Sequence, residues 1–388
     1  MANTLTNLIP DFYAALDVVS RELCGFIPSV ARDAKADQLA QNQTLRITVT
    51  PKNGSGGDIT PAMALPTAAG QTIGNVAVTM DKFRFFPFDW SGEEATAMDA
   101  GPGVLTIQQD QIAQAIRAAI NEMEADLAIA AYKGASRAYG TAATTPFGTA
   151  GDYTDAAETG RILDDNGAPK SDRHLVVNTA AGAKIRGKQA QSYMVGDTGL
   201  LRQGVLFDIN GFKIRESAQV QTVTAGTMAS ATTSAAALTV GQTVLPLATA
   251  GTGVVAAGDI ITLANDTNMY VVSAVSFAGA NPASGDTITI AAPGIRKAQS
   301  SATRNITVVA TATRNVAFTR NSLLLATRLP KVPPSGDLAA DRMIITDPLT
   351  GISMMLAYYP GYMMGQYQIQ LCWGTTVIKP EHMAILLG

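Results

Sequence analysis

The longest regular pattern in the chain lies at residues 104–138, VLTIQQDQIAQAIRAAINEMEADLAIAAYKGASRA. Apolar residues recur there at steps of three and four, as on one face of an α-helix: Ile112, Ile116, Ala119, Ile120, Met123, Leu127 and Ala130. Polar residues lie mostly off this stripe: Gln111, Gln114, Arg117, Asn121, Glu124 and Asp126. The Gly-Pro-Gly run at 101–103 marks its start, and Gly134 weakens its end. About 30 helical residues form a rod of roughly 45 Å, which predicts a spine against which other elements pack.

The segments before this helix predict an arm and a hairpin. Residues 9–39 show helical spacing broken by Gly25 and Pro28, which indicates an amphipathic arm rather than part of the core. TLRITVT at 44–50 and NVAVTM at 75–80 read as two strands. The glycine-rich, proline-containing run between them predicts a long hairpin loop with a flexible tip.

Mixed helices and strands are expected from residue 153 onward. Helices are predicted at 155–167 and 180–193, and strands at 173–178 and 211–220. The C-terminal stretch 351–388 predicts two or three long strands that pack against the spine helix, followed by a short apolar strand.

The composition changes beyond Val220. In residues 225–238, twelve of fourteen are Ala, Gly, Ser or Thr, and the segments after them are β-like: 242–247, 258–263, 269–275, 286–290 and 306–313. Short strands with turn residues between them predict a small β-barrel or sandwich. Helical and mixed character returns at 314–334, so residues 222–312 read as an insertion in a larger α/β unit.

The bulk composition favours a folded protein without strong charge-driven partners. Hydrophobic residues make up 47% and charged residues 15%. The net charge of −3 gives no general reason for tight binding to nucleic acid or to an anionic membrane, and a sequence-specific DNA reader is disfavoured. The N-terminus does not resemble a secretory signal, and no run of 18 uncharged apolar residues occurs, so we expect a soluble protein made in a cytoplasm.

Motifs with catalytic or ligand-binding chemistry are weak. Cys24 and Cys372 are too few for a disulfide framework or a Cys-rich zinc site and read as buried hydrophobic residues. GAKIRGKQ at 182–189 keeps the glycine and lysine spacing of a phosphate loop, but Gln189 replaces the Mg²⁺-binding hydroxyl and the segment also reads as helix.

His174 and His382 are more typical of a strand edge or turn than of catalysts, and no Gly-x-Ser-x-Gly motif supports a catalytic triad, although triad residues could still meet in space. NDTN at 265–268 resembles part of a calcium loop but reads as a polar hairpin turn. The acidic and basic clusters at 91–99 and 163–174 are solvated or helix-capping stretches, with contacts between subunits as the open alternative. We therefore predict no enzyme, and no catalytic, cofactor-binding or metal-binding residues.

The order of arm, hairpin loop, spine helix, α/β region and closing sheet resembles the Hong Kong 97-type fold of tailed-bacteriophage major capsid proteins over nearly the whole chain. Three segments are similar to the coat proteins of Salmonella-type short-tailed phages: NVAVTM leading to SGEE, RNVAFTRNSLLLATRLPKVPP at 314–334, and KPEHMAILL at 379–387. That subgroup carries an inserted β-barrel at the corresponding place. The insert in this chain differs in composition from the inserted barrel of that subgroup, because it is richer in Ala and Thr.

The resemblance implies an α+β chain with the following division: N-terminal arm at 1–40, E-loop hairpin at 41–90, P-domain with the spine helix at 91–150, first part of the A-domain at 151–221, inserted β-barrel at 222–312, second part of the A-domain at 313–344, and C-terminal P-domain strands at 345–388.

The implied function is structural. Copies arranged as hexamers and pentamers would close into the icosahedral shell of a virion around double-stranded DNA, through a precursor shell assembled in the bacterial cytoplasm. The implied partners are a scaffolding protein, a portal protein and DNA held by weak non-specific contact, with a decoration protein left open and no membrane. In this interpretation the hairpin overlaps the next subunit and the arm shifts during maturation.

Two other classes of function remain open at this point. One is an encapsulin-like compartment, whose shell has the same fold but encloses enzymes. The other is an enzyme or glycan-binding β protein that uses residues 222–312 as its binding unit. Tyr270 and Phe277 are the only aromatic residues of that unit, whereas carbohydrate sites usually need aromatic stacking surfaces.

Overall fold

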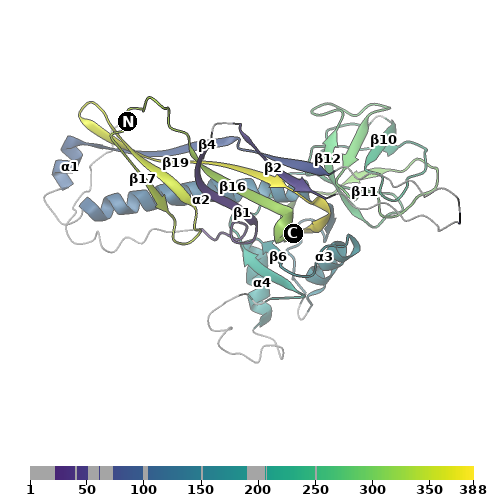
Figure 1. Ribbon diagram of the computed structural model, residues 1–388. Helices are drawn as coiled ribbons and strands as arrows, with labels where there is room; N and C mark the ends of the chain where they lie inside the picture. The colour runs from purple at the N-terminus through teal and green to yellow at the C-terminus, as the bar shows by residue number, and fades with distance from the viewer. Residues whose placement is uncertain are drawn as a thin grey trace.

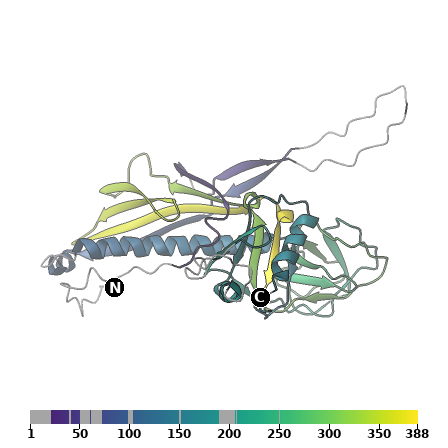
Figure 2. The same ribbon diagram turned by 90° about the horizontal axis from the view of Figure 1, so that it is seen from below.

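The protein is elongated, with a long helix that runs beside a long sheet (Figures 1 and 2). The computed structural model describes residues 22–39, 42–50, 61, 73–98, 104–149, 152–189, 206, 208–249 and 251–388. A second sheet and two further helices, α3 and α4, lie toward the C-terminal end of the long helix (Figure 1).

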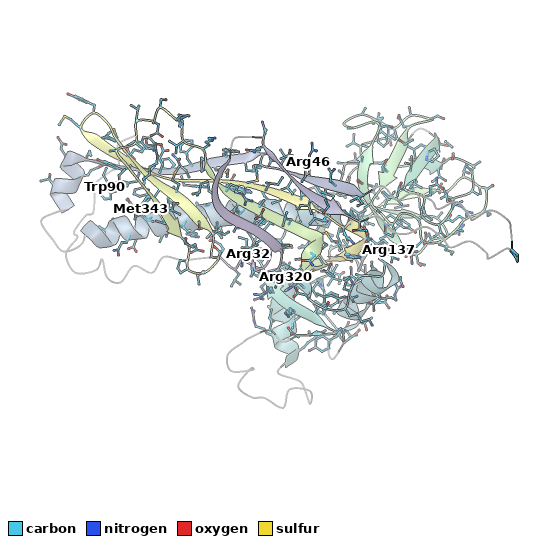
Figure 3. The ribbon with its side chains drawn as sticks, in the orientation of Figure 1. Arg32, Arg46, Trp90, Arg137, Arg320 and Met343 are labelled. Carbon is cyan, nitrogen blue, oxygen red and sulfur yellow. The ribbon has the colours of Figure 1, made fainter. Side chains whose placement is uncertain are left out.

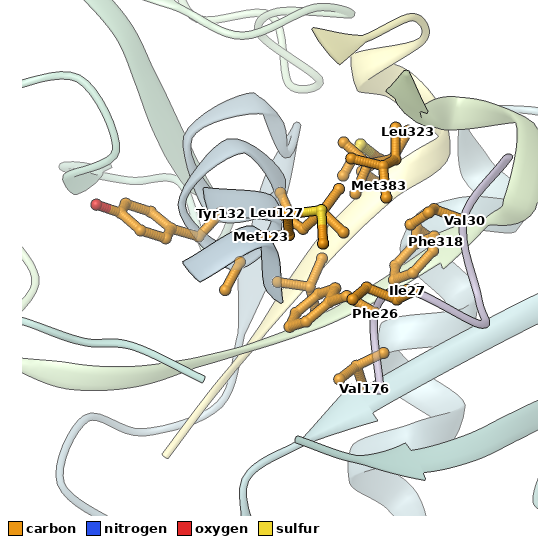
Figure 4. Close-up of a cluster of buried hydrophobic side chains, with 14 of the residues drawn as sticks. Phe26, Ile27, Val30, Met123, Leu127, Tyr132, Val176, Phe318, Leu323 and Met383 are labelled. Atoms are coloured by element: carbon orange, nitrogen blue, oxygen red, sulfur yellow. The ribbon is translucent and has the colours of Figure 1, made fainter. Parts of the chain in front are cut away.

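The long helix is α2, Val104–Gly134, with 31 residues, which confirms the predicted spine. Within the predicted apolar stripe, four residues are buried: Ala119, Ile120, Met123 and Leu127. They contribute to the largest hydrophobic cluster, which also receives side chains from segments far away in sequence, such as Phe26, Phe318 and Met383 (Figure 4). The spine is therefore stabilised mainly by tertiary burial of one face.

A six-stranded sheet packs along α2. Its order is β1 (Ala31–Leu39), β16 (Leu323–Pro330), β19 (Met364–Val377), β18 (Ser353–Pro360) and β17 (Asp341–Thr346), and β4 (Lys82–Ser91) pairs with the other side of β19. Ile369, Leu371 and Trp373 of β19 belong to the cluster around α2. The Trp373 indole N–H donates to Asp126 on α2 at 2.9 Å. These contacts confirm the prediction of C-terminal strands packed on the spine helix.

The second sheet has twelve strands. Its main order is β7 (Phe212–Glu216), β6 (Arg173–Val177), β15 (Ala312–Thr319), β20 (Met383–Leu387), β5 (Arg137–Tyr139), β12 (Met269–Val275), β13 (Thr287–Ile290), β10 (Val244–Thr249) and β9 (Thr232–Thr233). The remaining strands are β8 (Thr222–Val223), which pairs with β15, and β11 (Ile260–Leu263), which pairs with β12 and with β14 (Ile306–Val308). Helices α3, Thr154–Asp165, and α4, Thr179–Gln189, confirm the predicted α/β character of this part.

The predicted strands between residues 242 and 308 are also confirmed. A separate hydrophobic cluster draws its fully buried members from residues 228–306. This part is joined to the rest of the sheet through β5, which pairs in parallel with β20 and antiparallel with β12.

The predicted hairpin is present as β2, Thr44–Val49, paired antiparallel with β3, Gly74–Thr79. Val78 and Met80 pack against β16 and β19 and hold the base of the hairpin on the sheet. The residues predicted as its flexible tip lie outside the described residues, except for residue 61. After β4, the short helix α1, Gly92–Met98, begins with a capping box in which Ser91 and Glu94 bond each other's backbone N–H.

The prediction for the arm was wrong where the structure describes it. Residues 31–39 form β1, parallel to β16, instead of continuing a helix, because pairing satisfies the backbone of both strands. Phe26, Ile27 and Val30 are buried in the main core rather than outside it. Residues 9–21 lie outside the described part.

Residues 314–334 are also more strand-like than predicted. β15 and β16 fill most of this segment, with the short 3-10 helix η2, Arg320–Ser322, between them. Both strands are buried on both faces, so their apolar and polar residues do not alternate with a period that separates strand from helix. The division that groups 313–344 stays a prediction, although β15 and β16 belong to different sheets.

Candidate assembly surfaces

The phosphate-loop-like segment is not a loop. All of residues 182–189 lie in α4. The Lys188 amine is buried, donates to the Asp152 carbonyl, and lies 5.6 Å from the centre of the Phe147 ring and 5.1 Å from that of Tyr153. Burial also lowers the pKa of Lys188. The lysine is thus held by contacts within the chain, in agreement with the helical interpretation.

The two histidines lie on separate elements. His174 is buried on β6, with Nε2 3.1 Å from Asp172 Oδ1 and its ring stacked on Phe318. His382 ends the short 3-10 helix η3, Pro380–His382. Burial lowers the pKa of both imidazoles, which favours their neutral forms.

The polar turn at 265–268 is bonded internally. The Asp266 carboxylate accepts from the Asn268 backbone at 3.0 Å, the Asn268 side chain at 2.7 Å and the Tyr270 hydroxyl at 2.7 Å. Asn268 in turn accepts from the Arg137 guanidinium at 3.0 Å. The turn therefore ties β12 to the residues that follow the spine helix. Across the part of the chain described here, no group of three or more His, Cys, Asp or Glu side chains could hold a metal ion.

The two cysteines differ in their burial. Cys372 is buried as predicted, its thiol donates to the Arg328 carbonyl at 2.9 Å, and burial raises its pKa to about 11. Cys24 is only partly buried. In the described ranges, no helix is both long and apolar enough to cross a membrane.

The cluster at 163–174 forms bonds within the subunit. Arg173 donates to Asp164 at 2.7 Å, and Arg137 lies 3.3 Å from Asp165. Asn166 donates to the carbonyl of Glu381 at 2.8 Å. These bonds tie the end of α3 to β5, β6 and η3, so the cluster has a role within the subunit, and contacts between subunits stay a prediction.

The sequence interpretation missed Glu124. Its carboxylate is fully buried and accepts from the backbone N–H groups of Gly25 at 2.6 Å, Phe26 at 2.7 Å and Ile27 at 2.9 Å, and from the Ser217 hydroxyl at 2.8 Å. Burial raises its pKa, while these donors act in the opposite direction. The signal was available, because Glu124 follows Ile120 by four residues and precedes Leu127 by three, which places it on the apolar stripe.

An apolar surface lies at the end of the six-stranded sheet near α1, and we call it the distal tip. It comprises exposed residues around β17 and the β18–β19 turn: Leu338, Met343, Ile344, Tyr362, Met363 and Met364. β17 is an edge strand. Met343, labelled in Figure 3, and Ile344 are consecutive and both 56% exposed. This edge therefore presents apolar side chains on both faces. Exposed apolar edge strands are typical sites of association.

The face of this sheet opposite α2 is also partly uncovered. Phe86 and Ile369 pack toward α2, so their neighbours Phe85 and Gln370 point to the other face. The register places Phe85 beside Gln370 across β4 and β19. Phe85 is 59% exposed. This outer face and the distal tip are the two apolar surfaces of the six-stranded sheet considered below as assembly contacts.

Comparisons with known proteins show the fold. No protein-family profile and no curated protein match the chain. Among solved structures, it is similar to a capsid structure of Cyanophage P-SCSP1u, with a TM-score of 0.52 and 10% identity over 100% of this chain and 95% of the other. A Cyanophage A-1(L) capsid gives a TM-score of 0.51 and 10% identity, over 100% and 96% of the two chains. A structure from Mycobacterium phage Che8 gives 0.50 and 12%, over 99% and 98%. The chain therefore has the mixed α/β fold of these phage structures.

Proposed function

We propose that this chain is the major capsid protein of a tailed bacteriophage, with a Hong Kong 97-type fold, and that its role is structural rather than enzymatic. The observation that carries the proposal is the likeness to capsid structures over 100% of this chain and 95% and 96% of the other two, with TM-scores just above 0.5. The hairpin, the spine helix and the long β19 follow one another along the chain in the order that the sequence resemblance implies.

The exposed surfaces support this role. A shell is built from many repeated contacts between copies, and such contacts need apolar surface that remains uncovered in one isolated subunit. The distal tip and the outer face around Phe85 supply this surface. The hairpin of β2 and β3 is a two-stranded sheet, and we propose that it reaches over the outer face of the next subunit.

The proposed division of the chain follows the resemblance: arm, E-loop hairpin, P-domain, A-domain and a β-barrel inserted at 222–312. The separate hydrophobic cluster at 228–306 supports an inserted unit. The composition of 225–238 supports a boundary near its start.

The proposed setting is the virion. Hexamers and pentamers of this chain assemble with a scaffolding protein and a portal protein in the bacterial cytoplasm, and the shell matures around double-stranded DNA. Contact with DNA is weak and non-specific, in keeping with a net charge of −3.

The test of this proposal is electron microscopy of a deletion variant. We expect the chain lacking residues 53–57, coexpressed with the neighbouring genes, to yield folded subunits that do not close into shells. Circular dichroism of the purified subunit checks folding, and the intact chain is the control. Normal shells from the deletion variant would count against overlap of subunits through the hairpin.

A further inference from the structure

Arg314 is a buried cation whose donors have no acceptor in the described part of the chain. Its side chain is 1% exposed, and none of its guanidinium nitrogens, Nε, Nη1 and Nη2, has a hydrogen-bond partner among the described residues. A guanidinium stays protonated in a folded protein, and a buried charge without partners is strongly unfavourable. The Arg314 guanidinium therefore needs acceptors at this place.

Arg314 lies where three parts of the chain meet. Side chains alternate along β15, so Arg314 points to the same face as Ala312 and Val316, which belong to the hydrophobic cluster around α2. Tyr132, near the C-terminal end of α2, and Ile260 of β11 belong to the same cluster. In Figure 4 the Tyr132 ring points away from the other labelled side chains. The guanidinium is thus directed toward the end of the spine helix and the start of β11.

Asp259, the residue before β11, supplies a carboxylate at this junction. It is 4% exposed. Its neighbour Gly258 packs closely on the spine helix, because a Cβ there would lie 2.6 Å from Tyr132 Cε2. The Asp259 carboxylate accepts from the backbone N–H of Ala256 at 2.7 Å and of Gly226 at 3.2 Å. An ionised carboxylate has about four acceptor sites, so Asp259 can accept further hydrogen bonds.

Arg314 and Asp259 act on each other without a direct hydrogen bond. Burial lowers the pKa of Arg314, and the Asp259 carboxylate acts in the opposite direction. Burial raises the pKa of Tyr132, so the phenol beside them keeps its proton. Polar groups that interact inside a protein across more than hydrogen-bond distance are commonly bridged by ordered water.

We propose that ordered water bridges Arg314 and Asp259 beside the Tyr132 ring, and that this link holds the segment 222–312 on the spine helix. The water accepts from the guanidinium and donates to the carboxylate, so both buried groups are satisfied. One end of the link is β15, and the other is the carboxylate that binds Gly226 and Ala256. The inference goes beyond the proposed function, because it concerns a junction within one subunit.

Charge decides between water and a bound anion. The charges of Arg314 and Asp259 cancel, so neutral water completes the site without adding a buried charge. An anion would leave a net negative charge in a buried site that already holds a carboxylate, which is unfavourable.

Hydrogen exchange of the purified full chain tests the link. Arg314→Met removes the guanidinium and keeps an apolar side chain. We expect amide exchange in residues 256–260 to accelerate at least tenfold, because Asp259 loses its link to β15 and this segment opens more often. Unchanged or slower exchange would overturn the inference, since replacing a buried charge that lacks any partner by an apolar side chain is neutral or stabilising.

The Asp259→Asn background shows whether the two residues act through one link. In that background, Arg314→Met should change exchange in residues 256–260 less than twofold, because the link is already broken. Equal effects of Arg314→Met in both backgrounds would overturn the inference.

Arg328→Met is the matched control. Arg328 is also buried, but it donates to the Asp33 carboxylate at 2.6 Å and lies on β16 of the other sheet. It should change exchange in residues 256–260 less than twofold. An acceleration equal to that of Arg314→Met would overturn the inference, because the effect would not be specific to the junction.

A density map of the unaltered protein that resolves ordered water tests the site even if Arg314→Met does not fold. We expect at least one water within hydrogen-bond distance of both Arg314 and Asp259. A bound anion, a direct ion pair between the two side chains, or the lack of ordered water between them would overturn the inference. None of these outcomes bears on the proposed shell function, because all of them concern contacts within one subunit.

Discussion

At the scale of single residues, Glu124 joins three parts of the chain. Three consecutive backbone N–H groups, those of residues 25–27, and the Ser217 hydroxyl all donate to its carboxylate. Gly25 also lets this segment approach the backbone at residue 216, because a Cβ there would lie only 2.8 Å from the Glu216 carbonyl oxygen. A single buried side chain thus fixes the root of the arm to the spine helix and to the strand region near residue 217.

Replacing Glu124 tests this junction. We expect Glu124→Leu to lower the free energy of unfolding by about 3 to 5 kcal/mol, because it leaves buried N–H groups without acceptors. Glu124→Gln keeps one acceptor oxygen and should cost less. Urea denaturation followed by circular dichroism measures both. Equal stabilities of all three proteins would contradict the role assigned to the carboxylate.

Glu22 gives a prediction on pH. Hydrogen bonds from Arg117 and Asn121 lower its pKa from 4.5 to about 2. Since the folded-state pKa lies below the unfolded value, the stabilisation is fully present above about pH 4.5 and is lost as the pH falls toward 2. The difference in free energy of unfolding between the unaltered chain and Glu22→Gln should therefore shrink across this range. If this difference in free energy of unfolding stays constant from pH 6 to 2.5, Glu22 does not stabilise the fold through a lowered pKa.

At the scale of elements, the C-terminal end of α2 is fixed by close packing on β19. A Cβ added at Gly134 would lie 2.9 Å from Val377 Cβ. The glycine is thus needed for the close approach of helix and sheet. From the sequence alone, Gly134 was interpreted only as a residue that weakens the end of the helix.

Gly134→Ala should destabilise the protein by about 1 to 3 kcal/mol through overpacking. In an isolated helix the same change would stabilise the helix by about 1 kcal/mol. The sign of the change in protein stability therefore shows whether close packing or helix propensity dominates at this position. Val377→Ala in the same chain should restore part of the loss. Thermal unfolding is the measurement, and a stabilised Gly134→Ala variant would contradict the contact.

How far the sequence predicts these elements depends on how local their signals are. The spine helix and the β2–β3 strands follow from periods of 3.6 and 2 that are visible in the residues themselves. β1 was missed because its strand conformation depends on pairing with β16, almost 300 residues away. Glu124 was missed because a charged residue was assumed to lie off the apolar stripe, although its spacing placed it there.

The surfaces were harder still to predict. Met343 and Ile344 become a binding candidate only once the topology makes β17 an edge strand. A cavity of about 590 Å³ lies beside β2, and its lining residues are scattered along the chain between Ala31 and His382. No local sequence pattern shows that these residues come together.

At the scale of the whole molecule, the distal tip should act in assembly and not in folding. We expect Met343→Lys combined with Ile344→Lys to leave the unfolding temperature within a few degrees of the original, because both side chains are more than half exposed. The same change should abolish or strongly reduce shell formation. Lys331→Glu, on an exposed site outside the tip, serves as the control. Normal shells from the double variant would remove the tip from the assembly contacts.

We propose that this chain builds a closed shell. Its most direct test is electron microscopy of the purified protein, alone and after coexpression with its neighbouring genes. We predict uniform icosahedral particles, in which the β2–β3 hairpin of one copy lies over the outer sheet face of the next. Persistent monomers under all of these conditions would contradict the account.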